Sequence, residues 1–514
     1  MKPVVSSLKS PSSLRRAWSS GTEALGVTVL LLPLGVAPRL SAASPPPLSP
    51  LPEACRSDEL PAAAATTSDA VLAELVNREA NALLRGGRVA GIAVGVLRAG
   101  VPAFAGGFGF ADLEHSVPVT PDTFFRLASV SKQFTAAALL QQVEDGKLAL
   151  EDPLSRHFPL LRAPGGDPTL RQLLNHTSGL MSLTSVPDFR RRMALAQSVA
   201  DVVAMFDGAA ADFAPGDGFA YNNSAYILAG EIAARAAGND YPTLVRTRLF
   251  EPLGMKSSGY AHEDRLIPHR ARGYAVADGK LVPASWMNRE VPRGAGSLGS
   301  TVSDLLIWAR ALPELEVVGD ASFAAMVEPT ALPAPGRDDA FDVVSYGLGL
   351  ALGERDGVPW YGHGGNIEGF NTWIEWLPDD DLALVALVNT EGDHAHTLCE
   401  RLARRLAKPR TAAAATTAPA APAEPFDAAL RERCVGRYVS GSQSLRLRLS
   451  GDALELELDG AGATRLAWRG RRDGRFEFGI TADPSESFCI DLETTPPRAT
   501  LAGRMALRRF IRSE

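Results

Sequence analysis

The chain has 514 residues, of which 46% are hydrophobic and 22% are charged, and its formal net charge is −7. The chain is longer than a domain with one ordinary core, so its length indicates two or three domains. The composition is that of a soluble globular protein. The acidic balance provides no basic surface for nucleic acid, and we therefore exclude a nucleic-acid partner.

The first 43 residues have the features of a signal peptide. A basic start, "MKPVVSSLKSPSSLRRAW", precedes the apolar run "ALGVTVLLLPLGVA", and Ser41 and Ala43 suit a small-x-small cleavage site. The run is short for a membrane span, so we expect no stable span, although an uncleaved anchor is the competing interpretation. Arg15 and Arg16 match a twin-arginine signal only in part. We expect an exported protein, periplasmic or secreted, with a flexible leader at 44–67.

Helical and strand-like patterns then follow in an order typical of an α+β fold. A helical pattern at 68–85 precedes two β-like runs within 91–112, and helical patterns dominate from 129 to about 250. A second β pair occupies 372–389, before a helix at 396–407. The first and last strands can then lie together in a mostly antiparallel sheet, with a helical subdomain inserted. We expect a cleft between the two.

A low-complexity segment separates a small C-terminal domain from this large one. Residues 408–425, "KPRTAAAATTAPAAPAEP", predict a linker. Beyond them, "SLRLRLSGDALELELDG" alternates apolar and polar residues, which predicts a small β-barrel or β-sandwich over 426–514. The large domain is expected to span 68–407.

The stretch "RLASVSKQF" (126–134) places Ser129 and Lys132 three residues apart, where a helical run begins. Positions i and i+3 share a helix face, so Lys132 should project beside Ser129. A serine at a helix start is commonly a cap, which is the alternative to a nucleophile. The helix N-terminus disfavours a cation, and burial would lower the pKa of the lysine toward that of a usable base. The same S-x-x-K spacing at Ser6 and Lys9 shows that this motif alone is weak evidence.

Two further motifs accompany the serine and lysine. Tyr221 and Asn223 form a Y-x-N motif ahead of a helix, and "HGG" from His363 to Gly365 forms an H-x-G motif beside a predicted strand. With these motifs in this order, residues 68–407 resemble the serine β-lactamase and penicillin-binding-protein-like hydrolases, especially the class C side. The stretches "LRQLLNHTSGL" and "GAGSLGSTVSDL" agree with that resemblance. It implies a β-lactamase/transpeptidase-like fold, and the C-terminal domain resembles the lipocalin-like appendages of some relatives.

The resemblance also implies roles for the motif residues. Ser129 would attack a carbonyl and carry the acyl group, while Lys132, Tyr221 and His363 would take part in proton transfer or binding. The implied substrate-binding residues are Asn223, Gly364, Gly365 and Asn366, and Asn223 would also orient Lys132. The backbone N–H groups of Ser129 and Asn366 would form the oxyanion hole, and Gly365 would let the substrate lie close to the strand edge. Neither a metal nor another cofactor is expected.

His363 departs from the lysine that many β-lactamases carry at this position, and Gly364 provides no hydroxyl. This weakens the case for binding a substrate carboxylate and favours relatives such as D-aminopeptidases and esterases. We expect a serine hydrolase acting through an acyl-enzyme on a small-molecule ester, amide or peptide of D-amino-acid or β-lactam type. The alternatives are a non-turnover penicillin-binding sensor, a peptidoglycan D,D-carboxypeptidase and a non-catalytic scaffold. The oligomeric state is left open.

Several other signals do not predict sites. The G-x-G-x-x-G spacing at 294–299 follows no β-like run, so a dinucleotide site is not expected. His394 and His396 lack an accompanying ligand cluster, and the chain has no G-x-S-x-G elbow. Four cysteines allow three disulfide connectivities, of which the pairs 434–489 and 55–399 are our hypothesis.

Overall fold

The computed structural model describes most of the chain after residue 68. Its description covers 69–408 apart from 187–188, 196–197, 263, 289 and 331–342, and it covers 427–512 apart from short breaks at 441–442, 452, 459–462, 473–474, 481–482, 492–497 and 504–505. The predicted signal peptide, leader and nearly all of the predicted linker lie outside the described residues, as does Cys55. Among the described helices, none is both long and apolar enough to span a bilayer.

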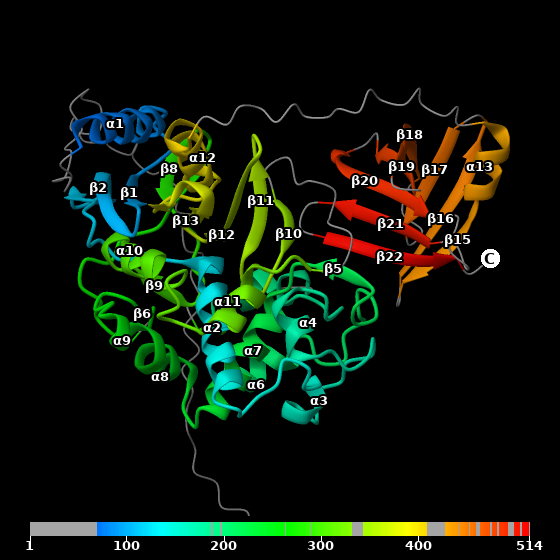
Figure 1. Cartoon of the computed structure of the whole chain (residues 1–514), viewed down its shortest axis with the longest axis horizontal. Helices are drawn as coiled ribbons and strands as arrows, with labels where there is room; N and C mark the ends of the chain where they lie inside the picture. Colours follow the sequence, from blue (N-terminus) through cyan, green and yellow to red (C-terminus); the bar gives the residue numbers. More distant parts are fainter. Residues whose placement is uncertain are drawn as a thin grey trace, which may run out of the picture. The chain divides into compact units, whose positions relative to one another are not determined.

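An antiparallel sheet of eight strands forms the centre of the large domain (Figure 1). The early strand β1 pairs with the late strand β14, with Ile92 opposite Val388 and Arg98 opposite Leu382. The prediction that the first and last strands lie together is therefore confirmed. In sheet order the strands are β10 (Val343–Tyr346), β11 (Ala351–Arg355), β12 (Val358–Ile367), β13 (Phe370–Leu377), β14 (Leu382–Val388), β1 (Gly91–Arg98), β2 (Val101–Asp112) and β3 (Val117–Pro118).

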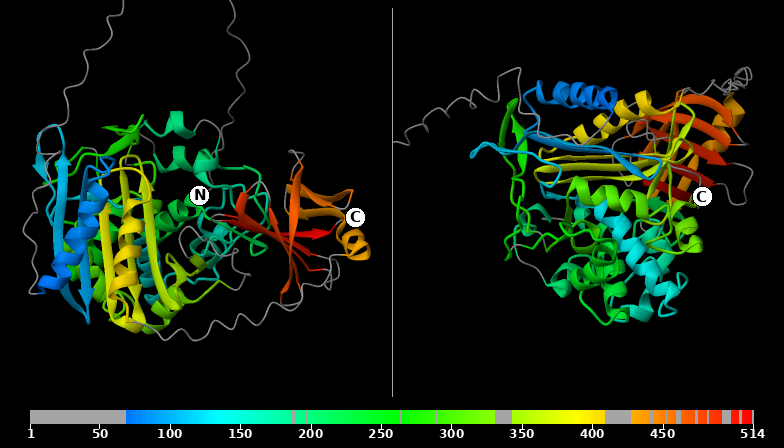
Figure 2. Two further views of the ribbon diagram at one scale, coloured as in Figure 1. Left: turned by 90° about the horizontal axis from the view of Figure 1, so that it is seen from above. Right: turned by 60° about the vertical axis from the view of Figure 1, so that its left-hand side comes forward.

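Helices cover both faces of this sheet (Figure 2). One face carries α1 (Ala70–Leu84) and α12 (His394–Leu406), and the other carries α10 (Val302–Ala311). Both faces of the central strands are therefore buried, which is why β1 reads as the nearly continuous apolar run "GIAVGVLR" rather than as an alternating strand. A Cβ at Gly95 would stand 2.8 Å from Val302 Cγ1, so glycine lets α10 pack closely on β1.

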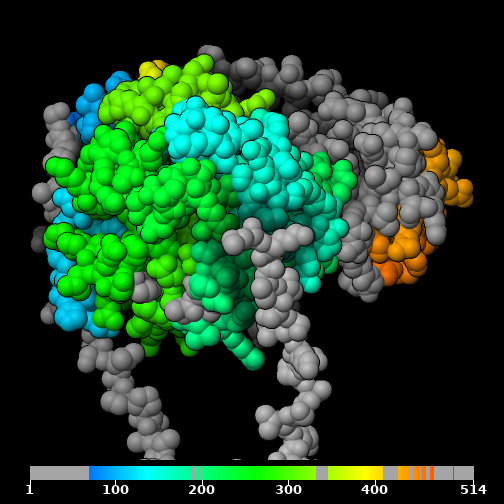
Figure 3. Space-filling model, turned by 90° about the horizontal axis from the view of Figure 1, so that it is seen from below, coloured from blue at the N-terminus to red at the C-terminus, as the bar shows by residue number. Residues whose placement is uncertain are grey.

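The helical subdomain is built around α2 (Ser131–Glu144), which is buried along nearly its whole length. Phe134 of α2 packs against Trp308, with the rings tilted and their centroids 4.0 Å apart. Just after the end of α2, Asp145 Oδ2 lies 3.1 Å from Arg248 Nη1. The segment that follows α2 and the segment around residue 248 adjoin on the surface in Figure 3. The other helices of this part are α3 (Leu154–His157), α4 (Leu170–Leu174), α5 (Phe189–Arg192), α6 (Val199–Ala204), α7 (Asn223–Ala236), α8 (Tyr241–Val245), η4 (Arg246–Phe250), α9 (Glu251–Leu253) and α11 (Asp320–Val327).

Short strands connect the subdomain to the sheet. β4 (Phe125–Arg126), β9 (Leu298–Ser300) and β6 (Gly259–Tyr260) form a three-stranded sheet, and β7 (Tyr274–Ala277) pairs with β8 (Lys280–Pro283). β4 leads directly toward Ser129, and β5 (Gly218–Ala220) leads directly toward Tyr221. Two motifs therefore begin where short strands end.

The C-terminal part is a separate small sheet domain that follows helix α13 (Ala428–Cys434). Its strands pair antiparallel in sequence order, and the first also pairs with the last. Leucines 445, 447, 454 and 456 are buried, as their alternation with polar residues predicted. The lipocalin-like character stays a prediction. The strands are β15 (Gly436–Ser440), β16 (Gln443–Ser450), β17 (Ala453–Leu458), β18 (Thr464–Arg472), β19 (Arg475–Ile480), β20 (Asp483–Asp491), β21 (Arg498–Gly503) and β22 (Ala506–Arg512).

Candidate active site

Ser129 lies in a single 3-10 turn, Ala128–Val130, directly before α2. Ala128 has a φ of 49°, an uncommon value for a residue with a Cβ and typical of functional turns. No side chain caps this turn or α2. Instead, Ser129 Oγ lies 3.1 Å from Lys132 Nζ. The geometry therefore favours the nucleophile over the helix cap, the alternative that the sequence left open.

Lys132 is fully buried and its amine has three neighbours. Nζ donates to Asn223 Oδ1 at 2.8 Å and to the carbonyl oxygen of Ala295 at 2.9 Å, and both of these groups can only accept. Burial holds the pKa of Lys132 well below its ordinary value of 10.5. A neutral amine has two N–H groups and one lone pair. Because the two N–H groups are engaged, the lone pair is left for the Ser129 hydroxyl.

The segment 170–180, "LRQLLNHTSGL", helps to position Tyr221 and Asn223. On the sequence alone, this segment only supported the family resemblance. Asn222 caps α7 by accepting from the N–H of Ala225 at 2.8 Å, and its own N–H donates to His176 Nδ1 at 3.0 Å. The His176 ring also packs on Tyr221 at 4.5 Å between centroids. His176 and Asn222 are therefore positioning residues that motif spacing alone did not identify.

Tyr221 lies beside both the lysine and the serine. Lys132 Nζ lies 4.7 Å from the centroid of the Tyr221 ring. Burial raises the pKa of Tyr221, and a hydrogen bond with Ser129 opposes that shift only in part. The phenol therefore stays protonated at neutral pH and can donate a proton.

Strand β12 brings the H-x-G motif to the nucleophile. Its pairing with β11 ends at Gly362, whereas its pairing with β13 continues to Ile367. Within the part of the chain that the structure describes, one edge of β12 beyond Gly362 thus has no strand partner, and this part of the strand contacts the turn that holds Ser129. An open strand edge can hydrogen-bond an extended substrate.

Packing against protein atoms explains the two glycines of the H-x-G motif. The predicted reason for Gly365 was different, namely close approach of the substrate. A Cβ at Gly365 would lie 2.3 Å from the carbonyl oxygen of Leu127, and a Cβ at Gly364 would lie 2.6 Å from the Trp373 ring. Protein atoms, not substrate, therefore occupy the space that these side chains would fill. Gly365 lets β12 approach the segment that leads to Ser129.

His363 is buried and both of its ring nitrogens are engaged away from the serine. Nε2 lies 2.8 Å from the hydroxyl of Tyr346, and Nδ1 lies 2.5 Å from the carbonyl oxygen of Gly364. Because a carbonyl can only accept, Nδ1 carries the proton and Nε2 accepts from Tyr346. Burial, with a smaller effect from Lys132, lowers the pKa of His363 to about 3. His363 is therefore neutral at neutral pH, and this geometry does not support its predicted part in proton transfer.

Two adjoining cavities open beside Ser129. The inner cavity of about 80 Å³ is lined by Ser129 and Asn223, and the outer one has about 490 Å³. The two share five lining residues, namely Thr184, Phe189, Met287, Asn366 and Ile367. A larger cavity of about 600 Å³, lined by residues between 240 and 269 and by Asp122 and Phe124, includes none of the predicted site residues.

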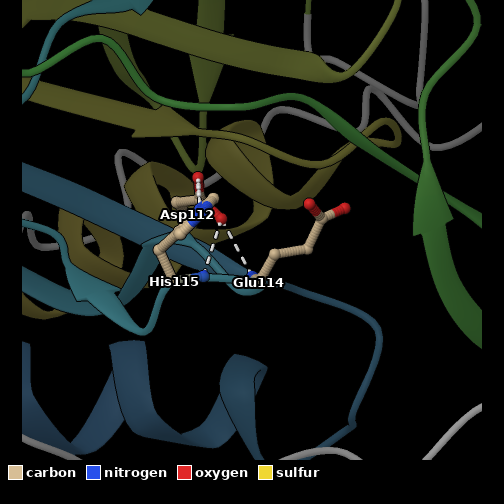
Figure 4. A group of neighbouring side chains, drawn as sticks. All are labelled: Asp112, Glu114 and His115. Carbon is tan, nitrogen blue, oxygen red and sulfur yellow. Dashed lines mark hydrogen bonds and ion pairs between the residues drawn. The ribbon is translucent and has the colours of Figure 1, made fainter.

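A group of three potential metal ligands lies outside this site (Figure 4). Asp112 Oδ1 accepts from the backbone N–H groups of Glu114 and His115 at 2.9 and 3.1 Å, and Oδ2 lies 2.9 Å from His115 Nδ1. Arg272 lies 2.5 Å from Glu114 and 4.0 Å from Asp112. These contacts account for the cluster without an ion.

The chain resembles known proteins over most of its length. A protein-family model described as Beta-lactamase matches residues 73–408. Penicillin-binding protein 4* of Bacillus subtilis (strain 168) is 28% identical over 422 residues, which are 74% of this chain and 88% of that protein. The D-aminopeptidase of Gluconobacter oxydans (strain 621H) is 28% identical over 307 residues, 58% of this chain and 55% of its own length.

A solved structure with a similar fold is that of the D-amino acid amidase from Ochrobactrum anthropi SV3 complexed with D-phenylalanine. It is 27% identical, has a TM-score of 0.57, and the match covers 65% of this chain and 98% of that one. The match thus covers nearly the whole amidase chain.

Proposed function

Because the chain belongs to the beta-lactamase family and is a serine hydrolase, we propose that it is an exported enzyme that forms an acyl-enzyme on Ser129 and cleaves small amides or esters. The preferred substrates are amides, peptides or esters of D-amino acids that carry no carboxylate on the leaving group. The observation that carries this proposal is the hydrogen-bond arrangement of Lys132, whose lone pair is left for Ser129.

Acylation begins with transfer of the Ser129 proton to neutral Lys132 while Oγ attacks the substrate carbonyl. The negative charge that forms on the carbonyl oxygen is stabilised by the N–H groups of Ser129 and Asn366. Tyr221 then protonates the leaving group, and its raised pKa keeps the phenol protonated until this step. In deacylation a water molecule takes the place of the leaving group, and the same proton transfers run in reverse.

The neutral state of His363 supports the substrate preference. A cation at this position would attract a carboxylate on the leaving group, whereas a buried imidazole with a pKa of about 3 carries no charge at neutral pH. The names of two similar proteins, a D-aminopeptidase and a D-amino acid amidase, point to the same substrate class. Export is supported by the basic and apolar pattern of residues 1–43.

A second candidate is a penicillin-binding role, with slow or absent turnover or with D,D-carboxypeptidase activity. It is favoured by the similarity to penicillin-binding protein 4*. This candidate requires recognition of a carboxylate, which distinguishes it from the first.

A substrate panel separates the two candidates. The panel contains a D-alanyl amide, a p-nitrophenyl ester, nitrocefin and a D-Ala-D-Ala peptide, each tested with the wild type and with Ser129→Ala. We expect turnover of the amide and the ester, and loss of both in the variant. Exclusive turnover of the D-Ala-D-Ala peptide or nitrocefin, or a stable adduct with nitrocefin, would favour the second candidate. Turnover retained by Ser129→Ala would contradict both.

A further inference from the structure

Glu368 is a charged side chain on the wall of the outer cavity that the reaction itself does not use. It follows the last residue of β12, Ile367, in the turn to β13. The turn does not need its carboxylate, because the N–H of Gly369 donates to Glu391 Oε1 at 3.1 Å. Glu368 Oε2 is buried and has no hydrogen-bond partner among the described residues. A carboxylate oxygen removed from water without a partner is unfavourable. A cation that enters the outer cavity can compensate this charge by approaching the part of the half-buried Glu368 side chain that lines the cavity.

The direction of β12 indicates which end of the substrate reaches Glu368. Tyr221, the proposed proton donor to the leaving group, lies near the start of the H-x-G motif, because its ring centroid is 6.1 Å from that of His363. Glu368 comes five residues later, about 16 Å along an extended strand. The proposed oxyanion donor, the N–H of Asn366, lies between them. The leaving group therefore points toward His363, and the acyl part points toward Ile367 and Glu368.

The rest of the cavity wall suits an apolar acyl group with a polar end. Phe189, Met287 and Ile367 line both cavities and give the acyl part an apolar surface. Arg191 also lines the outer cavity, but its side chain is exposed, so water and salt screen its charge. Glu368 is half-buried and therefore acts in a lower dielectric.

We propose that Glu368 binds a cationic amine on the acyl part of the substrate and so selects amides and esters of amino acids whose amine is unblocked. This inference rests on the proposed hydrolase function and adds the charge of the acyl group to it. Blocked substrates, and above all acyl groups that carry a carboxylate near this point, are disfavoured because they leave the charge of the Glu368 carboxylate uncompensated or repel it.

The test uses three p-nitroanilides that differ only in this group: that of D-phenylalanine, its desamino analogue 3-phenylpropionyl, and N-succinyl-D-phenylalanine. The full-length mature protein is compared with Glu368→Gln, which keeps the shape and removes the charge. Glu354→Gln, an exposed position on β11, is the matched control.

We expect Glu368→Gln to lower kcat/KM for the free-amine substrate by about 10- to 100-fold, mostly through KM, as for loss of a hydrogen bond to a charged group. The desamino substrate should change by less than about twofold, and the succinyl substrate should improve, since like-charge repulsion disappears. Glu354→Gln should match the wild type on all three.

Each contrary result has its own meaning. Equal losses on the amine and desamino substrates, or no loss on either, would overturn the role of Glu368 and leave the proposed function intact. Failure of the wild type to cleave any of the three, or cleavage of the succinyl substrate alone, would overturn both. If Glu368→Gln does not fold, inhibition of the wild type decides: 2-phenylethylamine should compete at least about tenfold better than 2-phenylethanol, and equal inhibition would overturn the inference.

Discussion

Asn223 offers a direct way to move the pKa of Lys132. Its Oδ1 accepts a hydrogen bond of 2.8 Å from Lys132 Nζ, and Lys132 is fully buried. The substitution Asn223→Asp keeps the shape of the side chain and puts a negative charge beside the amine. An opposite charge at this distance favours the ammonium form and raises the pKa of its neighbour by about 1–3 units.

The direction of the effect follows from the role of the amine. Neutral Lys132 is the proposed base, so kcat/KM falls as the pH drops below the pKa of Lys132. In Asn223→Asp we expect the acid limb of the pH profile to move to higher pH by about 1–3 pH units. At any pH on that limb, kcat/KM should fall about tenfold for each pH unit by which the limb moves. Activity should return toward alkaline pH.

The assay is kcat/KM for a p-nitrophenyl ester from acid to alkaline pH, with Ser129→Ala as the blank. Asn239→Asp is the control, because this exposed residue lies beyond the other end of α7, about 24 Å away by helix geometry, and receives the same change of charge. An acid limb that stays in place in Asn223→Asp, or that moves to lower pH, would refute the assignment of Lys132 as the base.

Two further substitutions test the packing around the site. Tyr346→Phe leaves the buried Nε2 of His363 without its donor, so we expect the free energy of unfolding to fall by about 1–3 kcal/mol in denaturant titration, and unchanged stability would contradict this hydrogen bond. Gly365→Ala would place a Cβ 2.3 Å from the carbonyl oxygen of Leu127 and push β12 away from the nucleophile, which should lower kcat by about 10²-fold or more. Gly259→Ala, where no atom lies within 4 Å of the new Cβ, should leave kcat near that of the wild type, and similar values for the two variants would contradict the packing argument.

Local patterns in the sequence predicted those features that depend on neighbouring residues. The i, i+3 spacing placed Lys132 beside Ser129, and the strand patterns predicted a sheet made from both ends of the large domain. The contact of Asn223 with Lys132, 91 residues apart, was predicted only through the family resemblance. No physical rule that acts along the chain specifies such a contact.

Features that depend on tertiary packing were not predictable in this way. Tyr346 fixes the proton of His363 only because β10, β11 and β12 are neighbours in the sheet. The space around Gly364 and Gly365 is filled by Trp373 and by the backbone of Leu127, which the motif alone could not reveal. The proposed role of Glu368 likewise depends on a cavity whose wall is formed by segments that are distant in the sequence.

The most direct test of the central claim is mass spectrometry of the acyl-enzyme. The mature protein is mixed with a p-nitrophenyl ester of a D-amino acid, quenched with acid within the first turnovers, and analysed intact and after proteolysis. We expect a mass increase equal to one acyl group, located on the peptide that contains Ser129 and absent from Ser129→Ala. An adduct on another residue, or turnover by Ser129→Ala at the rate of the wild type, would contradict the assignment of Ser129 as the nucleophile.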